Sequence, residues 1–124
     1  MEYKKIFGEL YSNAKDKFNI QQAPKLHLRQ DKESAKDIFG KTAYYDPNES
    51  TIVIFITNRH PKDILRSFCH EMIHHVQNER GDLELSGDLS PTYAQDDEHM
   101  RNMEKEAYLE GNLLLRDWED NFKY

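Results

Sequence analysis

Apolar residues recur every three or four positions in three stretches of the chain, which is the spacing of one face of an α-helix. The first stretch covers residues 2–18. The second begins at a proline, which suits the first turn of a helix, and covers residues 61–78, with Gly81 as a stop signal. The third covers about residues 98–118. The pattern therefore predicts three helices, one near each end of the chain and one between them.

Between the first two helices the pattern changes to that of strands. Residues 25–29 alternate polar and apolar side chains, which predicts a strand whose two leucines face inward. Residues 38–45 form a second predicted strand, and residues 51–57, apolar on both faces, form a third. The turn between them, residues 46–49, reads Asp-Pro-Asn-Glu and predicts a hairpin.

Together these elements predict an α+β fold. The small sheet of three strands is expected to be mostly antiparallel and to be backed by the N-terminal and central helices. The C-terminal helix follows a loop at residues 82–97, which contain Gly, Ser, Pro and Asp without a clear period. A chain of 124 residues with 37% hydrophobic content has enough apolar mass for one modest core, so residues 1–124 are expected to form a single domain.

The composition also bears on the compartment. The longest apolar run, residues 52–56, is far shorter than the roughly 20 residues that span a bilayer, so no membrane segment is expected. The first residues carry acids and lack a long apolar stretch, which is unlike a signal peptide. Cys69 is the single cysteine, which excludes an intrachain disulfide and fits a reducing compartment, so a cytoplasmic location is expected.

The charge is acidic and unevenly distributed. The net charge is -6, and residues 81–106 carry eight acidic and two basic side chains, which accounts for the whole excess. An acidic balance argues against binding to nucleic acid or to anionic membranes. A weak basic cluster at Arg59, Lys62 and Arg66 is better explained as a solvated face than as a phosphate site.

The central predicted helix contains the sequence His-Glu-Met-Ile-His at residues 70–74, an HExxH motif. His70 and His74 are four residues apart, so on a helix they share one face about 6 Å apart and can bind one metal ion. Zinc is the default for such ligands. Glu71 then lies beside the metal-activated water and can take its proton. For a chain of this composition, chance alone gives about 0.03 matches, so the surrounding residues must strengthen the assignment.

The helix face supports a site. Both motif histidines lie on the polar side of the predicted helix, whereas histidines that fill a core would more often lie within the apolar side. His75 falls beside the apolar side and is expected to pack or to form hydrogen bonds. Cys69 falls within the apolar side and is expected in the core, not as a nucleophile.

A catalytic zinc site usually has three protein ligands, so a third is needed. Four side chains follow the motif at a suitable distance along the chain: His99, Glu104, Glu106 and Glu110. On the last predicted helix only Glu104 lies well inside the apolar face, where a carboxylate is costly unless it is paired or bound to metal. Ala107 and Gly111 are small and would let this helix approach the HExxH helix closely. Glu104 is therefore the expected third ligand, with His99 as the leading substitute.

HExxH followed by Glu-x-x-Ala on a later helix resembles the gluzincin branch of zinc metallopeptidases. The small size and the strand–turn–strand before the motif resemble the minimal, broadly SprT-like domains of bacteria and phages. The match lies in four segments, residues 43–47, 59–66, 70–77 and 104–107. Together they cover roughly residues 40–115.

The resemblance implies a minimal zincin-like metallopeptidase fold with His70, His74 and Glu104 as zinc ligands and Glu71 as general base. It also implies a strand above the site, residues 51–57, that pairs with an extended peptide. The sequence departs from the family at Tyr108, where related gluzincins often have an Asp that steadies a ligand. The narrower SprT group uses a third histidine soon after HExxH, and no histidine occurs between His75 and His99.

These observations predict a zinc-dependent peptidase acting on a peptide or protein substrate. Tyr108, on the ligand-bearing face, is the first choice to stabilise an oxyanion, ahead of Tyr45 and Tyr93. The main alternative is a catalytically silent or latent zinc-binding module that acts through protein contacts, with residues 121–124 covering the cleft. Two others are a peptidase directed at DNA-bound or repressor proteins, which the acidic balance does not support, and a metal-free structural protein. The sequence does not predict the oligomeric state.

Overall fold

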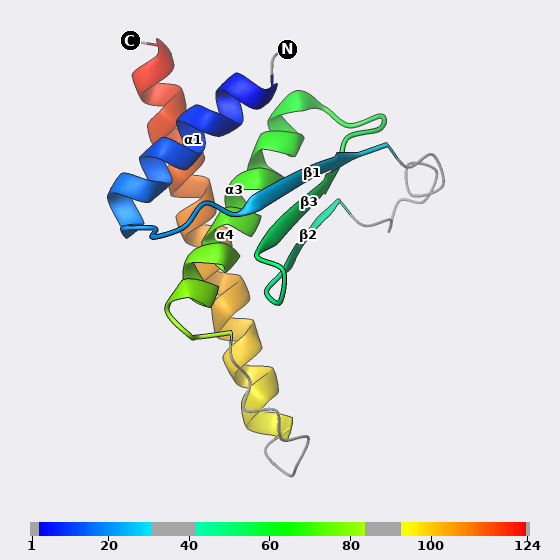
Figure 1. Ribbon diagram of the computed structural model, residues 1–124, viewed down its shortest axis with the longest axis vertical. Coiled ribbons are helices and arrows are strands. Elements are labelled where there is room, and N and C mark those ends of the chain that lie inside the picture. Colours follow the sequence, from blue (N-terminus) through cyan, green and yellow to red (C-terminus); the bar gives the residue numbers. More distant parts are fainter. Residues whose placement is uncertain (1–2, 31–41, 84–92, 124) are drawn as a thin grey trace.

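The computed structural model describes residues 3–30, 42–83 and 93–123 (Figure 1). Its elements are helix α1 (Tyr3–Phe18), strands β1 (Lys25–Arg29), β2 (Ala43–Asp46) and β3 (Thr51–Phe55), and helices α3 (Pro61–Glu79) and α4 (Tyr93–Lys123). This confirms an α+β architecture with three helices and a three-stranded sheet within the described residues. No helix in these ranges has the length and apolar content needed to cross a membrane.

The sheet is mixed, which corrects the expectation of a mostly antiparallel sheet. The strand order is β1-β3-β2. Strands β2 and β3 form the predicted antiparallel hairpin, with Asp46 opposite Thr51, whereas β1 runs parallel to β3, with Lys25 also opposite Thr51. Alternating polarity identifies a strand and its faces, but it does not specify which neighbour the strand joins or in which direction. The hairpin was predictable because its turn is local.

Strand β3 lies in the centre of the sheet, and this overturns the expectation that residues 51–57 pair with a peptide. From Thr51 to Phe55, one edge of β3 is paired with β1 and the other with β2. No main-chain edge is left for a substrate. Among the described strands the free edges belong to β1 and β2, and β2 is the one that lines the cleft described below.

Two strand boundaries also differ from the prediction. Strand β3 ends at Phe55, two residues earlier than expected. Strand β2 begins at Ala43, and residues 38–41 of the predicted strand lie outside the described residues. In β1, Leu26 is half-buried but Leu28 is exposed, because this edge strand is covered on one part of its face alone.

The hairpin turn has the chemistry that its sequence indicated. The Asp46 carboxylate accepts hydrogen bonds from the backbone N–H groups of Asn48 (3.0 Å) and Glu49 (3.3 Å). Such an Asx turn satisfies backbone donors that the strands cannot reach. It fixes the end of β2 next to the C-terminal half of α3, where the Asn78 amide donates to the Pro47 carbonyl (3.1 Å).

Helix α3 has a well-defined beginning and end. Pro61 occupies the first turn, and His60 caps the helix by accepting the Lys62 N–H at Nδ1 (3.1 Å). At the other end Gly81 has φ +83° and completes a Schellman-type turn, in which the Asp82 N–H donates to Gln77 O (2.9 Å). These caps leave the central turns of α3, which carry the HExxH motif, regular and fully hydrogen-bonded.

Arg59 joins the sheet to α3 and is not available as a phosphate ligand. Its Nη1 donates to the backbone carbonyls of Thr42 and Phe55, both at 2.8 Å. Its Nη2 donates to the Asp63 carboxylate (2.8 Å) and to Ser67 Oγ (2.7 Å). One guanidinium thus connects the ends of β2 and β3 to the first two turns of α3 by hydrogen bonds. These bonds fix the position of β2 relative to that helix.

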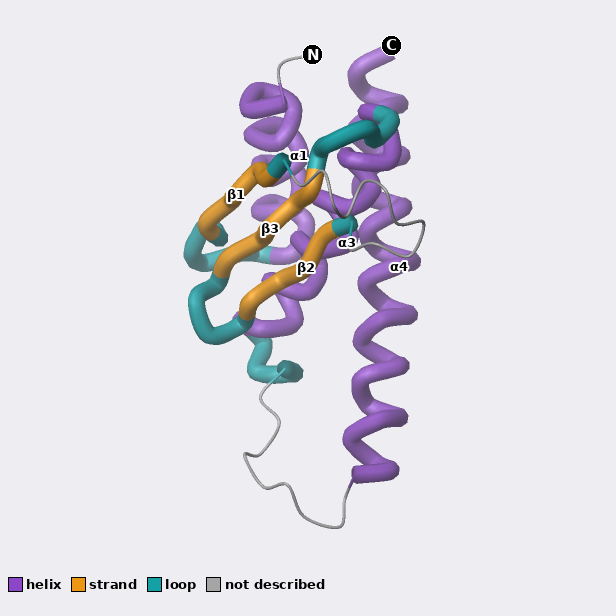
Figure 2. The backbone as a smooth tube through the Cα atoms, turned by 90° about the vertical axis from the view of Figure 1, so that its right-hand side faces the viewer, coloured by secondary structure: helices purple, strands orange, loops and turns teal. Residues whose placement is uncertain are grey.

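Helix α3 is the middle layer of the molecule. It contacts β2 and β3 on one side and α1 and α4 on the other (Figure 2). Helix α1 packs on α3 and α4, where the Phe7 and Phe68 rings stack with centroids 4.4 Å apart and Trp118 Nε1 donates to Glu9 (2.8 Å). Among the described helices, α3 makes the close backbone contacts with the sheet. Helix α1 contributes to the same hydrophobic core as β3 through its buried residues Phe7, Leu10 and Ala14.

Helix α4 is longer than predicted at both ends. It begins at Tyr93, inside the expected loop at 82–97, and continues to Lys123. Residues 84–92 of that loop lie outside the described residues. The tail from Asn121 to Lys123 continues the helix, so the described part of the tail does not fold over the cleft as the latent alternative would require.

The α3–α4 contact is tightest where small residues of α4 face the motif. Ala107 is fully buried, as expected. A Cβ atom at Gly111 would lie 3.1 Å from both Cα and N of His70, against the backbone of α3. A side chain here would push the two helices apart, so Gly111 sets the separation of the helices at the level of the first motif histidine.

We expect Gly111→Ala to lower the free energy of unfolding by about 1 kcal/mol, because the overpacking cost of about 1–3 kcal/mol exceeds the gain in helix propensity of about 1 kcal/mol. Gly8→Ala is the matched control, since a Cβ atom at Gly8 in α1 meets nothing within 4 Å and only the propensity gain applies. Urea unfolding measures both variants. A Gly111→Ala protein stabilised as much as Gly8→Ala would show that the close approach is absent.

Candidate metal site

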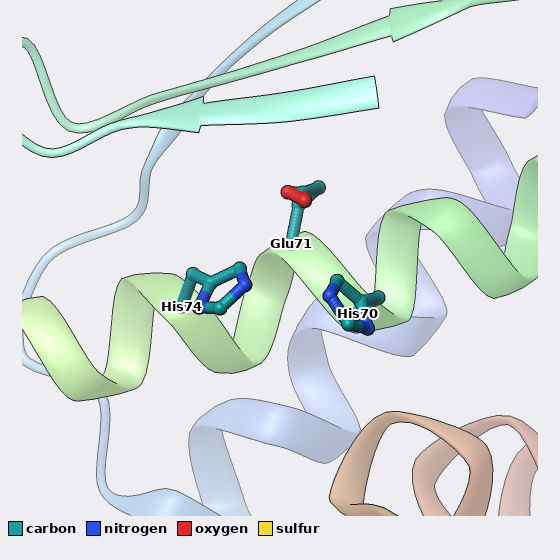
Figure 3. Close-up of side chains that lie close together, drawn as sticks. All are labelled: His70, Glu71 and His74. Atoms are coloured by element: carbon teal, nitrogen blue, oxygen red, sulfur yellow. The ribbon is translucent and has the colours of Figure 1, made fainter. Parts of the chain in front are cut away.

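Two histidines of α3 and one carboxylate of α4 meet between the helices. His70 and His74 are one turn apart, and their ring centroids are 4.9 Å apart (Figure 3). Glu104 reaches across from α4. Its Oε2 lies 3.1 Å from His70 Nε2, and its Oε1 lies 2.9 Å from His74 Nε2. The structure therefore brings together the three residues that the sequence suggested as ligands.

Glu104 is not buried, which corrects the premise that selected it. Its side chain is 57% exposed, whereas His70 and His74 are 22% and 9% exposed. A helical wheel assumes that the apolar arc is covered along the whole helix. Among the described residues the carboxylate of Glu104 meets side chains of α3, and it lies on the open rim between the helices with its oxygens directed at the imidazoles.

Glu71 occupies a different environment from Glu104. It is 6% exposed and points from α3 toward the strands, between the two histidines in sequence (Figure 3). Its Oε2 is buried without a hydrogen-bond partner among the described residues. Burial raises the pKa of Glu71 to about 7. His70, Glu71 and His74 each offer one ligand atom, and these three atoms lie within 4.8 Å of one another, so the group can hold a metal ion.

A cleft of about 700 Å³ opens over these side chains. One wall is the edge strand, residues 42–45, and the opposite wall is formed by α4, including Ala107 and Tyr108. His70, Glu71 and His74 form part of its floor. A cleft of this size with few, convergent polar groups is the usual form of a ligand or substrate site.

Tyr108 lies beside the histidines but is largely open to solvent. Its ring meets the His70 ring edge to face, with centroids 5.6 Å apart, and the residue is 68% exposed.

Burial of the His70 side chain lowers the pKa of His70. The neighbouring His74 lowers it further, whereas Glu104 raises it. Neutral imidazole, the form that binds metal, is thereby favoured.

His74 has a second contact that the sequence analysis missed. Its Nδ1 lies 2.8 Å from Oε1 of Gln77, which is fully buried. The Gln77 amide nitrogen donates in turn to Met103 O (2.9 Å) and to Glu106 Oε1 (2.8 Å). Glu106 also accepts from Arg80, which lowers the pKa of the Glu106 carboxyl and keeps it ionised. The signal in the sequence was the i,i+3 spacing of His74 and Gln77, which places both on one helix face.

The remaining histidines and the cysteine are used elsewhere. His75 is buried, with Tyr45 Oη 2.7 Å from Nδ1 and Gln22 O 2.7 Å from Nε2, which confirms that it packs and forms hydrogen bonds. His99 Nε2 lies 2.6 Å from Asp82 O, in the turn after α3, so it is not a substitute ligand here. Cys69 is fully buried in the core, as expected, and burial raises the pKa of its thiol. The Tyr93 side chain lies outside the described part of the chain.

The contact between His74 and Glu104 has a chemical consequence. A neutral His74 that donates from Nδ1 to Gln77 has only a lone pair at Nε2, and this lone pair faces a carboxylate oxygen 2.9 Å away. Two acceptors at that distance repel each other unless a positive charge lies between them. A proton on His74 would satisfy the pair, and so would a metal ion bound by both groups.

No protein-family model, no curated protein and no solved structure matches this chain. What the cleft can do therefore follows from its own donor atoms. These are two imidazole Nε2 atoms facing one carboxylate, with a second, buried carboxylate beside them.

Proposed function

We propose that this protein is a zinc-dependent metallopeptidase in a minimal zincin-like fold. His70, His74 and Glu104 hold the metal, and Glu71 is the general base. The observation that carries the proposal is the meeting of both Nε2 atoms with the two oxygens of Glu104, at 3.1 and 2.9 Å. Beside them Glu71 Oε2 is buried, has no hydrogen-bond partner in the part of the chain that the structure describes, and would supply the base that the reaction needs.

The donor set fits zinc. The two histidine Nε2 atoms lie 3.1 and 2.9 Å from different oxygens of Glu104, so one ion between the helices would be within reach of all three side chains. Two imidazoles and one carboxylate are typical of catalytic zinc sites, which leave one position open. His70, His74 and Glu104 all line the cleft, so a metal ion held by them would be reached from it.

Zinc, when bound, polarises the scissile carbonyl and makes the attacking water more acidic. Glu71 takes the proton of that water on its carboxylate and delivers it to the leaving nitrogen. Burial suits this role, because the loss of solvation that raises the pKa of Glu71 in the metal-free protein makes its carboxylate a better proton acceptor. Tyr108 is proposed to support the oxyanion from the rim of the cleft, beside His70.

The proposed substrate is an extended peptide lying along β2. Strand β2 is an edge strand among the described elements, and residues 42–45 line the cleft opposite α4. An edge strand offers backbone donors and acceptors to a peptide that adds to the sheet. The peptide would then pass above Glu71, which points toward the strands (Figure 3).

We expect about one zinc per chain, measured by elemental mass spectrometry on protein purified without a His-tag or added metal. Glu104→Ala should weaken zinc binding by about 100-fold or more, since loss of a ligand costs more than the roughly 10–100-fold lost with an outer partner. Glu110→Ala is the control, because Glu110 lies on the same helix and contacts Lys17 (3.5 Å) instead of the histidines. No uptake of zinc from a dilute solution would refute the site.

Glu71→Gln should retain zinc and the fold while lowering the rate of peptide cleavage by about 10²–10⁴-fold, because the amide cannot accept the proton of the water. Cleavage of unfolded chains of mixed sequence, followed by mass spectrometry, measures the rate. Wild-type turnover in Glu71→Gln would exclude Glu71 as the base. A wild-type protein that holds zinc and cleaves nothing would instead indicate the zinc-binding module without catalysis.

A further inference from the structure

Gln77 contacts one proposed zinc ligand and the backbone and side chain of the opposite helix. We propose that Gln77 is a positioning residue that fixes the tautomer of His74, so that the Nε2 lone pair of His74 faces the cleft. The assignment of that lone pair to zinc rests on the proposed function. The tautomer itself follows from hydrogen bonds among protein atoms.

The orientation of the Gln77 amide is determined by what surrounds it. One amide end lies 2.9 Å from the backbone carbonyl of Met103 and 2.8 Å from the carboxylate of Glu106. A carbonyl oxygen and a carboxylate can only accept hydrogen bonds, so this end must be the NH₂ group. The carbonyl oxygen of the amide is therefore the atom that faces His74, and a flipped amide would place oxygen against two acceptors.

The orientation of Gln77 determines the proton position on His74. The Gln77 oxygen can only accept, so the His74 Nδ1 atom 2.8 Å away must donate. A neutral imidazole carries one ring proton, and that proton is then on Nδ1. Nε2 is left with a lone pair, directed at the site where it meets Glu104.

The rest of the cluster holds Gln77 in place. Gln77 is fully buried, so water does not compete for its amide. Glu106 is held from the other side by Arg80, which also pairs with Asp82 at 2.9 Å. Because Met103 and Glu106 belong to α4 whereas Gln77 and Arg80 lie on or just after α3, the cluster couples the His74 ring to the packing of the two helices.

His75, the next residue, is held in the opposite tautomer. Its Nε2 lies 2.7 Å from the backbone carbonyl of Gln22 and must donate to it. In neutral His75 the Nδ1 atom then accepts from the Tyr45 hydroxyl, 2.7 Å away. Both nitrogens of His75 thus meet groups outside the cleft, whereas the Nε2 atom of His74 faces Glu104 at the site. Neighbouring histidines with opposite tautomers provide an internal comparison within one molecule.

Nitrogen NMR of the metal-free protein, recorded as the pH is raised until each histidine carries a single ring proton, tests the tautomers directly. We expect that proton on Nδ1 of His74 and on Nε2 of His75. A His74 whose single ring proton is on Nε2, with Nδ1 bare, would overturn the proposal. This measurement needs neither zinc nor activity, and it decides the question even where variants of Gln77 fail to fold.

Two variants of equal length separate positioning from a general structural role. Gln77→Met and Gln77→Glu both lose the donors to Met103 and Glu106, but only Gln77→Glu keeps an acceptor for His74 Nδ1. We expect Gln77→Met to give mixed His74 tautomers and a zinc Kd about 10–100-fold weaker, with His75 unchanged. Gln77→Glu should keep the His74 tautomer and a zinc Kd within a few-fold of wild type.

The positioning role would be refuted if both variants lost the same amount of zinc affinity. It would also be refuted if Gln77→Met kept the wild-type His74 tautomer and zinc affinity. Thermal unfolding measures the stability of both variants, so that a loss of stability common to both is not mistaken for an effect on the His74 tautomer. If the wild-type protein binds zinc with the expected tautomer yet cleaves no peptide, the role of Gln77 stands and the peptidase function fails. If it binds no zinc, the zinc site fails, and the NMR spectra still decide the tautomer.

Discussion

The close packing of α4 on α3 is the constraint on which the site depends. The helices meet at Gly111, where the backbone of one lies against the backbone of the other at His70. This separation decides whether the oxygens of Glu104, two turns earlier on α4, reach both imidazoles. Interiors transmit small displacements because they are tightly packed. The arrangement of the proposed ligands is therefore a property of a helix–helix interface, and not of the motif helix alone.

Three carboxylates near this interface have different environments, and the environment gives each its role. Glu71 is buried, and this raises its pKa to about 7, while its Oε2 has no hydrogen-bond partner among the described residues. Glu106 accepts from Arg80 and Gln77, which lower its pKa and hold it ionised. Glu104 is exposed at the rim and directed at the histidines. In the proposed site the same functional group would thus serve as a proton acceptor, an anchor for a hydrogen-bond cluster and a metal ligand, according to burial and neighbours.

The sheet contributes by position more than by chemistry. Its central strand is fully paired, and its edge strand β2 is held over α3 by Arg59, which bridges Thr42, Phe55 and Asp63. That bridge leaves one strand edge along the cleft. A basic residue that could suggest an anion site is thus a structural cross-link, because its donors are already used by backbone carbonyls and a carboxylate.

The sequence by itself determined the local features: three helices, the hairpin with its Asp46 turn, the caps of α3 and the spacing of His70 and His74. Each follows from neighbours within a few positions along the chain, where periodicity and turn chemistry act. It also suggested Glu104, but on the expectation that this carboxylate would be buried, and in the structure it is exposed. Only the tertiary structure decided the parallel pairing of β1, the exposure of Glu104 and the contact of Gln77 with α4. These depend on which surfaces meet across the fold, and no local pattern encodes that.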